Sequence, residues 1–124
     1  MRDRLQSYVI VGFGEHPKCP LPKHRPETLH LKRGESVKIW IRSVFQDALL
    51  KPESQKKINY MAINDFGEVA TGGAAFSGTI ITDANGFADL PTYSPTELGV
   101  FRLRLDYADR AGSSYSYSPR IIVI

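Results

Sequence analysis

The sequence predicts an all-β protein, a sandwich of two packed antiparallel sheets with about seven to nine short strands. Apolar and polar residues alternate in short runs, and Gly, Pro, Asn and Asp punctuate the intervals between the runs. No segment of about ten residues carries the period of a helix. The chain of 124 residues is expected to be a single domain, 1–124, large enough to bury one hydrophobic core.

The first half of the chain is predicted to hold three strands, at 7–13, 28–32 and 36–45. Residues 1–6 are expected to be a flexible N-terminus, and 14–27 is expected to be a proline-rich loop without regular structure. The third strand has the clearest period-two pattern. Val37, Ile39 and Ile41 are predicted to face the core, whereas the intervening side chains, Lys38, Trp40 and Arg42, are predicted to face outward.

The second half is predicted to begin with a polar stretch, 46–57, that holds a helical turn at 47–50, and to continue with strands at 58–63, 76–82, 87–90, 98–107 and 115–124. Asp83 and Gly86 lie between two alternating runs, and they predict a hairpin because Asp accepts a backbone bond and Gly takes φ > 0. The glycine-rich segment 72–75 is either a flexible loop or a place where another backbone docks. The 121–124 tail is too apolar to lie in water, so it is predicted to dock in a sheet.

One pattern extends over this region: T-D-x-N-G-x-A-x-L at 82–90, followed by L-G-x-F-x-L-x-L at 98–105. It resembles the bacterial immunoglobulin-like domains of invasin-type adhesins and the related macroglobulin-like modules. The resemblance implies an immunoglobulin-like sandwich. In such domains a Tyr often lies two residues beyond a Gly at the corner before the penultimate strand, where its hydroxyl bonds the backbone. Here Phe101 follows Gly99, so the aromatic packing is kept and the hydroxyl is missing.

Composition and charge exclude several classes of function. The 16 Lys and Arg residues exceed the 13 Asp and Glu residues by only 3, and they are spread along the chain, so nucleic acid is not expected as a partner. No apolar run approaches the length of a membrane span, and no signal peptide is visible. We therefore expect no membrane insertion, and synthesis in the cytoplasm. Cys19 is the only cysteine, so the core must be stabilised without an intrachain disulfide.

Catalytic and metal-binding motifs are weak. No serine lies in a G-x-S-x-G turn, so the chain is not expected to be an enzyme, and no cofactor is expected. One group of residues has metal-ligating side chains spaced as H-x2-C-x4-H-x5-H: His16, Cys19, His24 and His30. These spacings match no common zinc motif, and His30 lies between two inward-facing leucines. The favoured interpretation is a surface loop without metal.

The remaining candidates are surface residues for protein contacts. Lys38, Trp40 and Arg42 combine an aromatic with cations, a mixture enriched at binding hot spots. Trp40 is equally well explained if a neighbouring strand or the proline-rich loop covers it. Tyr115 and Tyr117 alternate with serines, which suits a recognition surface, although an ordinary edge strand is favoured.

These observations predict a non-enzymatic structural or binding module that acts through a protein partner or through self-assembly. The expected fold and the lack of a signal peptide resemble the immunoglobulin-like accessory proteins of tailed bacteriophage virions, which decorate capsids, tails or fibres. The alternative is a carbohydrate-binding or adhesin-type module of a larger cell-surface protein, with Trp40, Tyr93, Tyr115 and Tyr117 stacked on sugars. A third hypothesis is a metal-dependent or hydrolytic domain that uses the histidine cluster.

Overall fold

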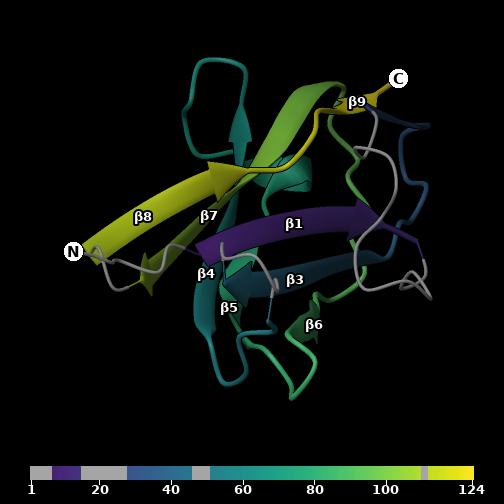
Figure 1. The fold of residues 1–124 in the computed structure, drawn as a ribbon. Coiled ribbons are helices and arrows are strands. Elements are labelled where there is room, and N and C mark those ends of the chain that lie inside the picture. Colours follow the sequence, from purple (N-terminus) through teal and green to yellow (C-terminus); the bar gives the residue numbers. More distant parts are fainter. Residues whose placement is uncertain (1–6, 15–27, 46–50, 110–111) are drawn as a thin grey trace.

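A computed structural model describes residues 7–14, 28–45, 51–109 and 112–124, and this part of the chain is all β apart from one 3-10 turn (Figure 1). The strands are β1 (Ser7–Phe13), β2 (Leu29–Leu31), β3 (Ile39–Phe45), β4 (Lys57–Asn64), β5 (Ser77–Ile81), β6 (Phe87–Asp89), β7 (Gly99–Asp109), β8 (Gly112–Tyr117) and β9 (Ile121–Val123), and the 3-10 turn is η1 (Gly72–Ala74). The expectation of an all-β protein is therefore confirmed. The helical turn expected at 47–50 and nearly all of the proline-rich loop lie outside the described residues.

The strands form two sheets. The smaller sheet has the order β1-β3-β6, and the larger has the order β2-β9-β7-β4-β5, with β8 also paired to β7. The β2–β9 pair is parallel, which corrects the expectation of purely antiparallel sheets. Parallel pairing is open to these two strands because most of the chain lies between them and provides the long connection that such a pair needs.

The two sheets share one hydrophobic core. Ile39 and Ile41 of β3 in the smaller sheet belong to the same buried cluster as Ile58 of β4 and Leu103 and Leu105 of β7 in the larger sheet. Each of these five side chains is at most 1% exposed. The alternation read from the sequence places these residues on the inner faces, so the orientation of the central strands is confirmed.

The turn between β5 and β6 forms as predicted, but the predicted hairpin does not. The Asp83 carboxylate accepts hydrogen bonds from the N–H groups of Asn85 (2.8 Å) and Phe87 (3.0 Å), and Gly86 has φ +81°. However, β5 pairs with β4 in the larger sheet, whereas β6 pairs with β3 in the smaller one. The segment 82–86 therefore carries the chain from one sheet to the other. Local turn chemistry fixed the turn, and long-range pairing decided which strands flank it.

The C-terminal segment docks in the larger sheet, as predicted, although as two strands rather than one. Between β8 and β9 the Ser118 N–H donates to the Leu103 carbonyl (2.8 Å), and the Ser118 hydroxyl accepts from the Leu103 N–H (2.8 Å). Pro119 interrupts the ladder at this point because it has no N–H to donate. Beyond the break, Ile121 and Val123 are buried and pair with both β7 and β2.

The glycine-rich segment around η1 is a docking point for another backbone, one of the two alternatives that the sequence left open. The Thr96 N–H donates to the Gly73 carbonyl (3.0 Å), and a Cβ added at Gly73 would lie 1.9 Å from the Thr96 hydroxyl oxygen. The Tyr93 hydroxyl donates to the Ala74 carbonyl (2.9 Å) from a side chain that is only 2% exposed. Tyr93 thus supplies, before β7, the buried hydroxyl-to-backbone bond that Phe101 cannot make.

Candidate functional site

Trp40 is buried, which corrects its prediction as an exposed interface residue. Its side chain is 4% exposed, and it lies opposite Gly12 of β1 in the ladder. A Cβ at Gly12 would lie 2.0 Å from Trp40 Cζ2, so the indole ring covers this glycine. The Phe87 ring of β6 packs against the indole with ring centroids 5.7 Å apart and ring planes inclined at 64°. Neighbouring strands on both sides therefore contact Trp40, in agreement with the alternative interpretation.

Arg42 is also buried rather than presented on the surface, at 6% exposed. Its Nε donates to the Asn85 carbonyl (3.1 Å), and its guanidinium carbon lies 4.9 Å from the centre of the Phe87 ring. Burial lowers the pKa of Arg42 below its ordinary value, and the nearby Asp83 carboxylate acts in the opposite direction. These contacts tie β3 to the 83–87 turn. Of the three interface candidates expected in this region, only Lys38, which directly precedes β3, has an exposed position.

Of the four candidate metal ligands, which the sequence did not favour as a metal site, only His30 lies within the described residues. His30 lies on β2 with an exposed side chain, between the partly buried Leu29 and the buried Leu31, as the alternation indicated. His16, Cys19 and His24 lie outside the described residues. In the described part of the chain, no three His, Cys, Asp or Glu side chains come together in a way that could hold a metal ion.

Tyr115 and Tyr117 are the predicted aromatic interface residues that the structure exposes, at 56% and 46%. They lie on the outer face of β8 with ring centroids 5.6 Å apart and ring planes inclined at 70°. The guanidinium carbon of Arg104, on β7, lies 4.7 Å from the centre of the Tyr115 ring, and its Nε donates to the Asp106 carboxylate (3.1 Å). We call Arg104, Tyr115 and Tyr117 the tyrosine–arginine cluster.

The alternation of Tyr and Ser along β8 has a structural explanation. In the register with β7, Tyr117 lies opposite Arg104 and Ser116 lies opposite the buried Leu105. The serines therefore take the inward positions, where the Ser116 hydroxyl is 2.8 Å from the hydroxyl of Tyr107. This arrangement leaves the tyrosines on the outer face of a strand that, within the described chain, pairs with β7 alone.

A groove of about 440 Å³ lies beside this cluster, between β1 and the junction of β8 and β9. One wall consists of 8–11 on β1, and the other consists of Arg102, Tyr117, Ser118 and Pro119. In the ribbon, β1 and β8 run in the same direction (Figure 1), and only the last residue of β8, Tyr117, lines the groove. Sequence patterns could not reveal this groove because its two walls come from opposite ends of the chain.

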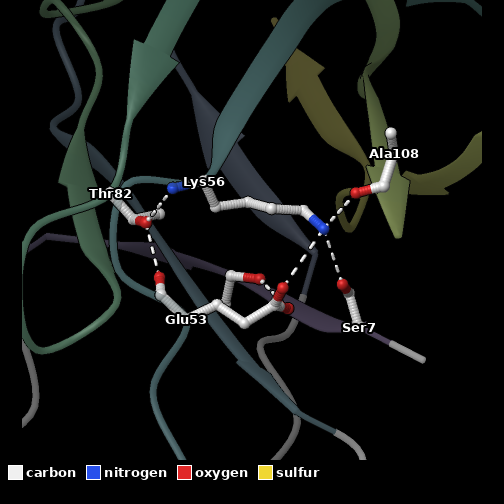
Figure 2. Close-up of polar contacts among 6 residues, drawn as sticks. Ser7, Glu53, Lys56, Thr82 and Ala108 are labelled. Atoms are coloured by element: carbon white, nitrogen blue, oxygen red, sulfur yellow. Dashed lines mark hydrogen bonds and ion pairs between the residues drawn. The ribbon is translucent and has the colours of Figure 1, made fainter. Parts of the chain in front are cut away.

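A buried polar network is the other feature that the sequence did not reveal (Figure 2). The Lys56 ammonium donates to the Ser7 hydroxyl (2.8 Å) and to the Ala108 carbonyl, and it forms an ion pair with Glu53 (3.2 Å). The Glu53 carboxylate also accepts from the Ser43 hydroxyl (2.9 Å). Both charged side chains are less than 10% exposed, at 9% for Lys56 and 8% for Glu53.

The network connects the two sheets, since Ser7 and Ser43 belong to the smaller sheet and Ala108 to the larger one. Thr82 extends it from the end of β5, because its hydroxyl donates to the Glu53 carbonyl (2.5 Å) and accepts from the Lys56 N–H (2.8 Å). All of the polar side chains are satisfied by each other or by the backbone, which is what burial of charge requires. The arrangement indicates a stabilising role rather than a reactive site.

Comparison with known proteins finds no matching family model, no similar curated protein and no similar solved structure. Within the described residues, no helix has the length and apolar character needed to cross a membrane. The tyrosine–arginine cluster and the adjoining groove are therefore the features on which a proposal about function rests.

Proposed function

We propose that this chain is a non-enzymatic module with an immunoglobulin-like sandwich fold that acts through protein–protein contacts. Strand order supports the fold. The grouping of β1, β3 and β6 in one sheet, and of β4, β5, β7 and the C-terminal strands in the other, follows the division of strands in immunoglobulin-like sandwiches.

The observation that carries the proposed function is the tyrosine–arginine cluster. Tyr and Arg are enriched at protein interfaces, and Tyr offers a large contact area at a small cost in side-chain entropy. Here the Tyr115 ring contacts both the Tyr117 ring and the Arg104 guanidinium. The Arg104–Asp106 pair is partly exposed, at 39% and 41%, so it contributes little stability and mainly orients the guanidinium.

The setting that we propose is a structural assembly, as a decoration, tail or fibre component of a virion, with a protein partner or further copies of the chain. The alternative, a carbohydrate-binding or adhesin-type module of a cell-surface protein, has less support. Of its four proposed stacking residues, Trp40 and Tyr93 are buried, at 4% and 2% exposed. Only Tyr115 and Tyr117 remain for it, and their inclined rings do not form one flat platform.

The test compares wild-type protein with the Tyr115→Ala/Tyr117→Ala variant by light scattering during size-exclusion chromatography. If the chain assembles with itself, the double variant should dissociate. If the wild type is monomeric, both proteins serve as bait for partners in particles purified from the native host, with mass-spectrometric detection. The double variant should lose the virion protein that the wild type captures.

The matched control is Phe66→Ala, which removes an aromatic side chain 87% exposed in the turn after β4. This variant should assemble or capture like the wild type. Equal behaviour of wild type and double variant in both measurements would refute the proposed function. Loss of glycan-array binding in the double variant, without any captured protein, would favour the carbohydrate alternative.

A further inference from the structure

We infer that the groove between β1 and β8 binds an extended peptide strand carrying a carboxylate side chain, with the peptide adding to the smaller sheet along the edge of β1. The inference deepens the proposed function by naming the chemistry of a protein partner, and it rests on that function. Three observations support it: β1 has an unpaired edge within the described chain, a groove lies beside that edge, and the side chain of Arg102 lines the groove.

The open edge follows from the hydrogen bonds of β3. Val9 lies opposite Ser43, whose N–H donates to the Gly86 carbonyl (2.8 Å) and whose carbonyl accepts from the Glu53 N–H (2.9 Å). The backbone groups of Ser43 therefore point away from β1, so Val9 and Ser43 are a non-hydrogen-bonded pair. It follows that the N–H and carbonyl of Val9, and of Val11 two residues on, point away from β3 and toward the groove.

No strand in the described part of the chain pairs with this edge of β1. Unpaired N–H and carbonyl groups along a strand edge are a template for another extended backbone. The inward Val9 and Val11 side chains pack against the core, and the outward Tyr8 is 45% exposed. An added strand would thus bond to the backbone of Val9 and Val11 while its own side chains contact Tyr8 and Tyr117, which both line the groove.

The charge of the groove specifies one side chain of the ligand. Arg102 is the charged member of the lining, and its side chain is partly buried. Among the described residues its guanidinium has neither an ion pair nor a hydrogen bond, in contrast to Arg104, which bonds Asp106. A carboxylate on the incoming strand would give Arg102 a charge-assisted partner, so we assign an Asp or Glu side chain to the peptide at this point.

The probe is a capped peptide of about six residues in which valine and threonine alternate, with one central glutamate. It is titrated into isotope-labelled protein while backbone amide resonances are followed by NMR. The Val9 and Val11 amides should shift most, and the same peptide with glutamine should bind about fivefold more weakly. Absence of shifts along β1, or equal affinity for the two peptides, would overturn the inference.

Two pairs of variants test the contacts separately. Val9→Pro removes the N–H that faces the groove and leaves the β3 ladder intact, whereas Val9→Ala shortens the side chain and keeps the N–H. Binding should be lost in the first and kept in the second, with folding of both checked by thermal unfolding. Arg102→Gln should abolish the preference for glutamate, and Arg120→Gln, at an exposed position, should preserve it.

All four variants leave the tyrosine–arginine cluster intact, so the two proposals can fail independently. Binding by Val9→Pro as tight as by Val9→Ala would refute strand addition, whatever the result with Tyr115 and Tyr117. If the peptide binds as described but the Tyr115→Ala/Tyr117→Ala variant behaves like the wild type in assembly and capture, peptide binding in the groove is supported. The proposed role of the tyrosine–arginine cluster is then refuted. Formation of a dimer through the β1 edge, instead of peptide binding, would also overturn the inference, because a second copy of the chain would then occupy that edge.

Discussion

At the scale of single residues, Tyr93 shows how one buried hydroxyl shapes both packing and pH dependence. The centroids of the Tyr93 and Phe76 rings are 4.5 Å apart, and the Tyr93 hydroxyl donates to the Ala74 carbonyl. Burial raises the pKa of Tyr93 to about 12, from an ordinary value of 10. The folded protein holds this proton more tightly than the unfolded chain does. The contribution of the protonated Tyr93 hydroxyl to the free energy of unfolding is therefore fully present below pH 10 and is lost as the pH rises toward 12.

We therefore expect the free energy of unfolding to fall by about 2 kcal/mol between pH 10 and 12, measured by urea denaturation. Tyr93→Phe should lower stability at neutral pH by about 1 kcal/mol, through loss of the bond to Ala74, and should reduce the alkaline loss. Part of that loss will remain, because burial also raises the pKa of Tyr60. A Tyr93→Phe variant with the full wild-type alkaline loss would contradict the assignment, and Tyr115→Phe, at an exposed position, serves as the control.

At the scale of elements, the packing of Trp40 on Gly12 joins β1 to β3. Gly12→Ala should lower the free energy of unfolding by about 1–3 kcal/mol, because the new methyl group would overlap the indole ring. The measurement is chemical denaturation of a double-mutant cycle. In a Trp40→Leu background the same glycine substitution should cost much less, within about 0.5 kcal/mol of zero. An equal cost in both backgrounds would show that the indole is not the limiting contact.

At the scale of the whole molecule, the Lys56 network joins the two sheets by hydrogen bonds to Ser7 in one and Ala108 in the other. Lys56→Met would leave the buried Glu53 carboxylate without its ion pair, so we expect a loss of about 3 kcal/mol in the free energy of unfolding. The Lys56→Met/Glu53→Gln variant should recover part of this loss, because the uncompensated charge is gone. Lys57→Met, at the neighbouring exposed position, should change stability by less than about 0.5 kcal/mol. Equal stability of the two lysine variants would refute the role of the network.

Whole-molecule topology also decides which surfaces remain for partners. Trp40, Lys38 and Arg42 have the composition of a hot spot, yet the indole and guanidinium are buried by contacts that include β1, β6 and the 83–87 turn. Tyr115 and Tyr117 lie on a strand that pairs with β7 alone within the described chain, as the sequence favoured, and they are also an exposed aromatic pair. The sequence placed all of these residues in strands, and only the neighbouring strands determined which of them lie at the surface.

The sequence by itself determined the features that depend on neighbouring residues. Period-two alternation located the strands, Asp83 and Gly86 specified the turn, and the apolar run from Ile121 required a docked C-terminus. Tertiary structure alone decided that β5 and β6 belong to different sheets, that Trp40 is covered, and that Lys56 pairs with Glu53 beside Ser7. It also created the groove between β1 and β8. The physical reason is that alternation and turn chemistry act over a few residues, whereas strand partners and burial arise from contacts between residues far apart in the chain.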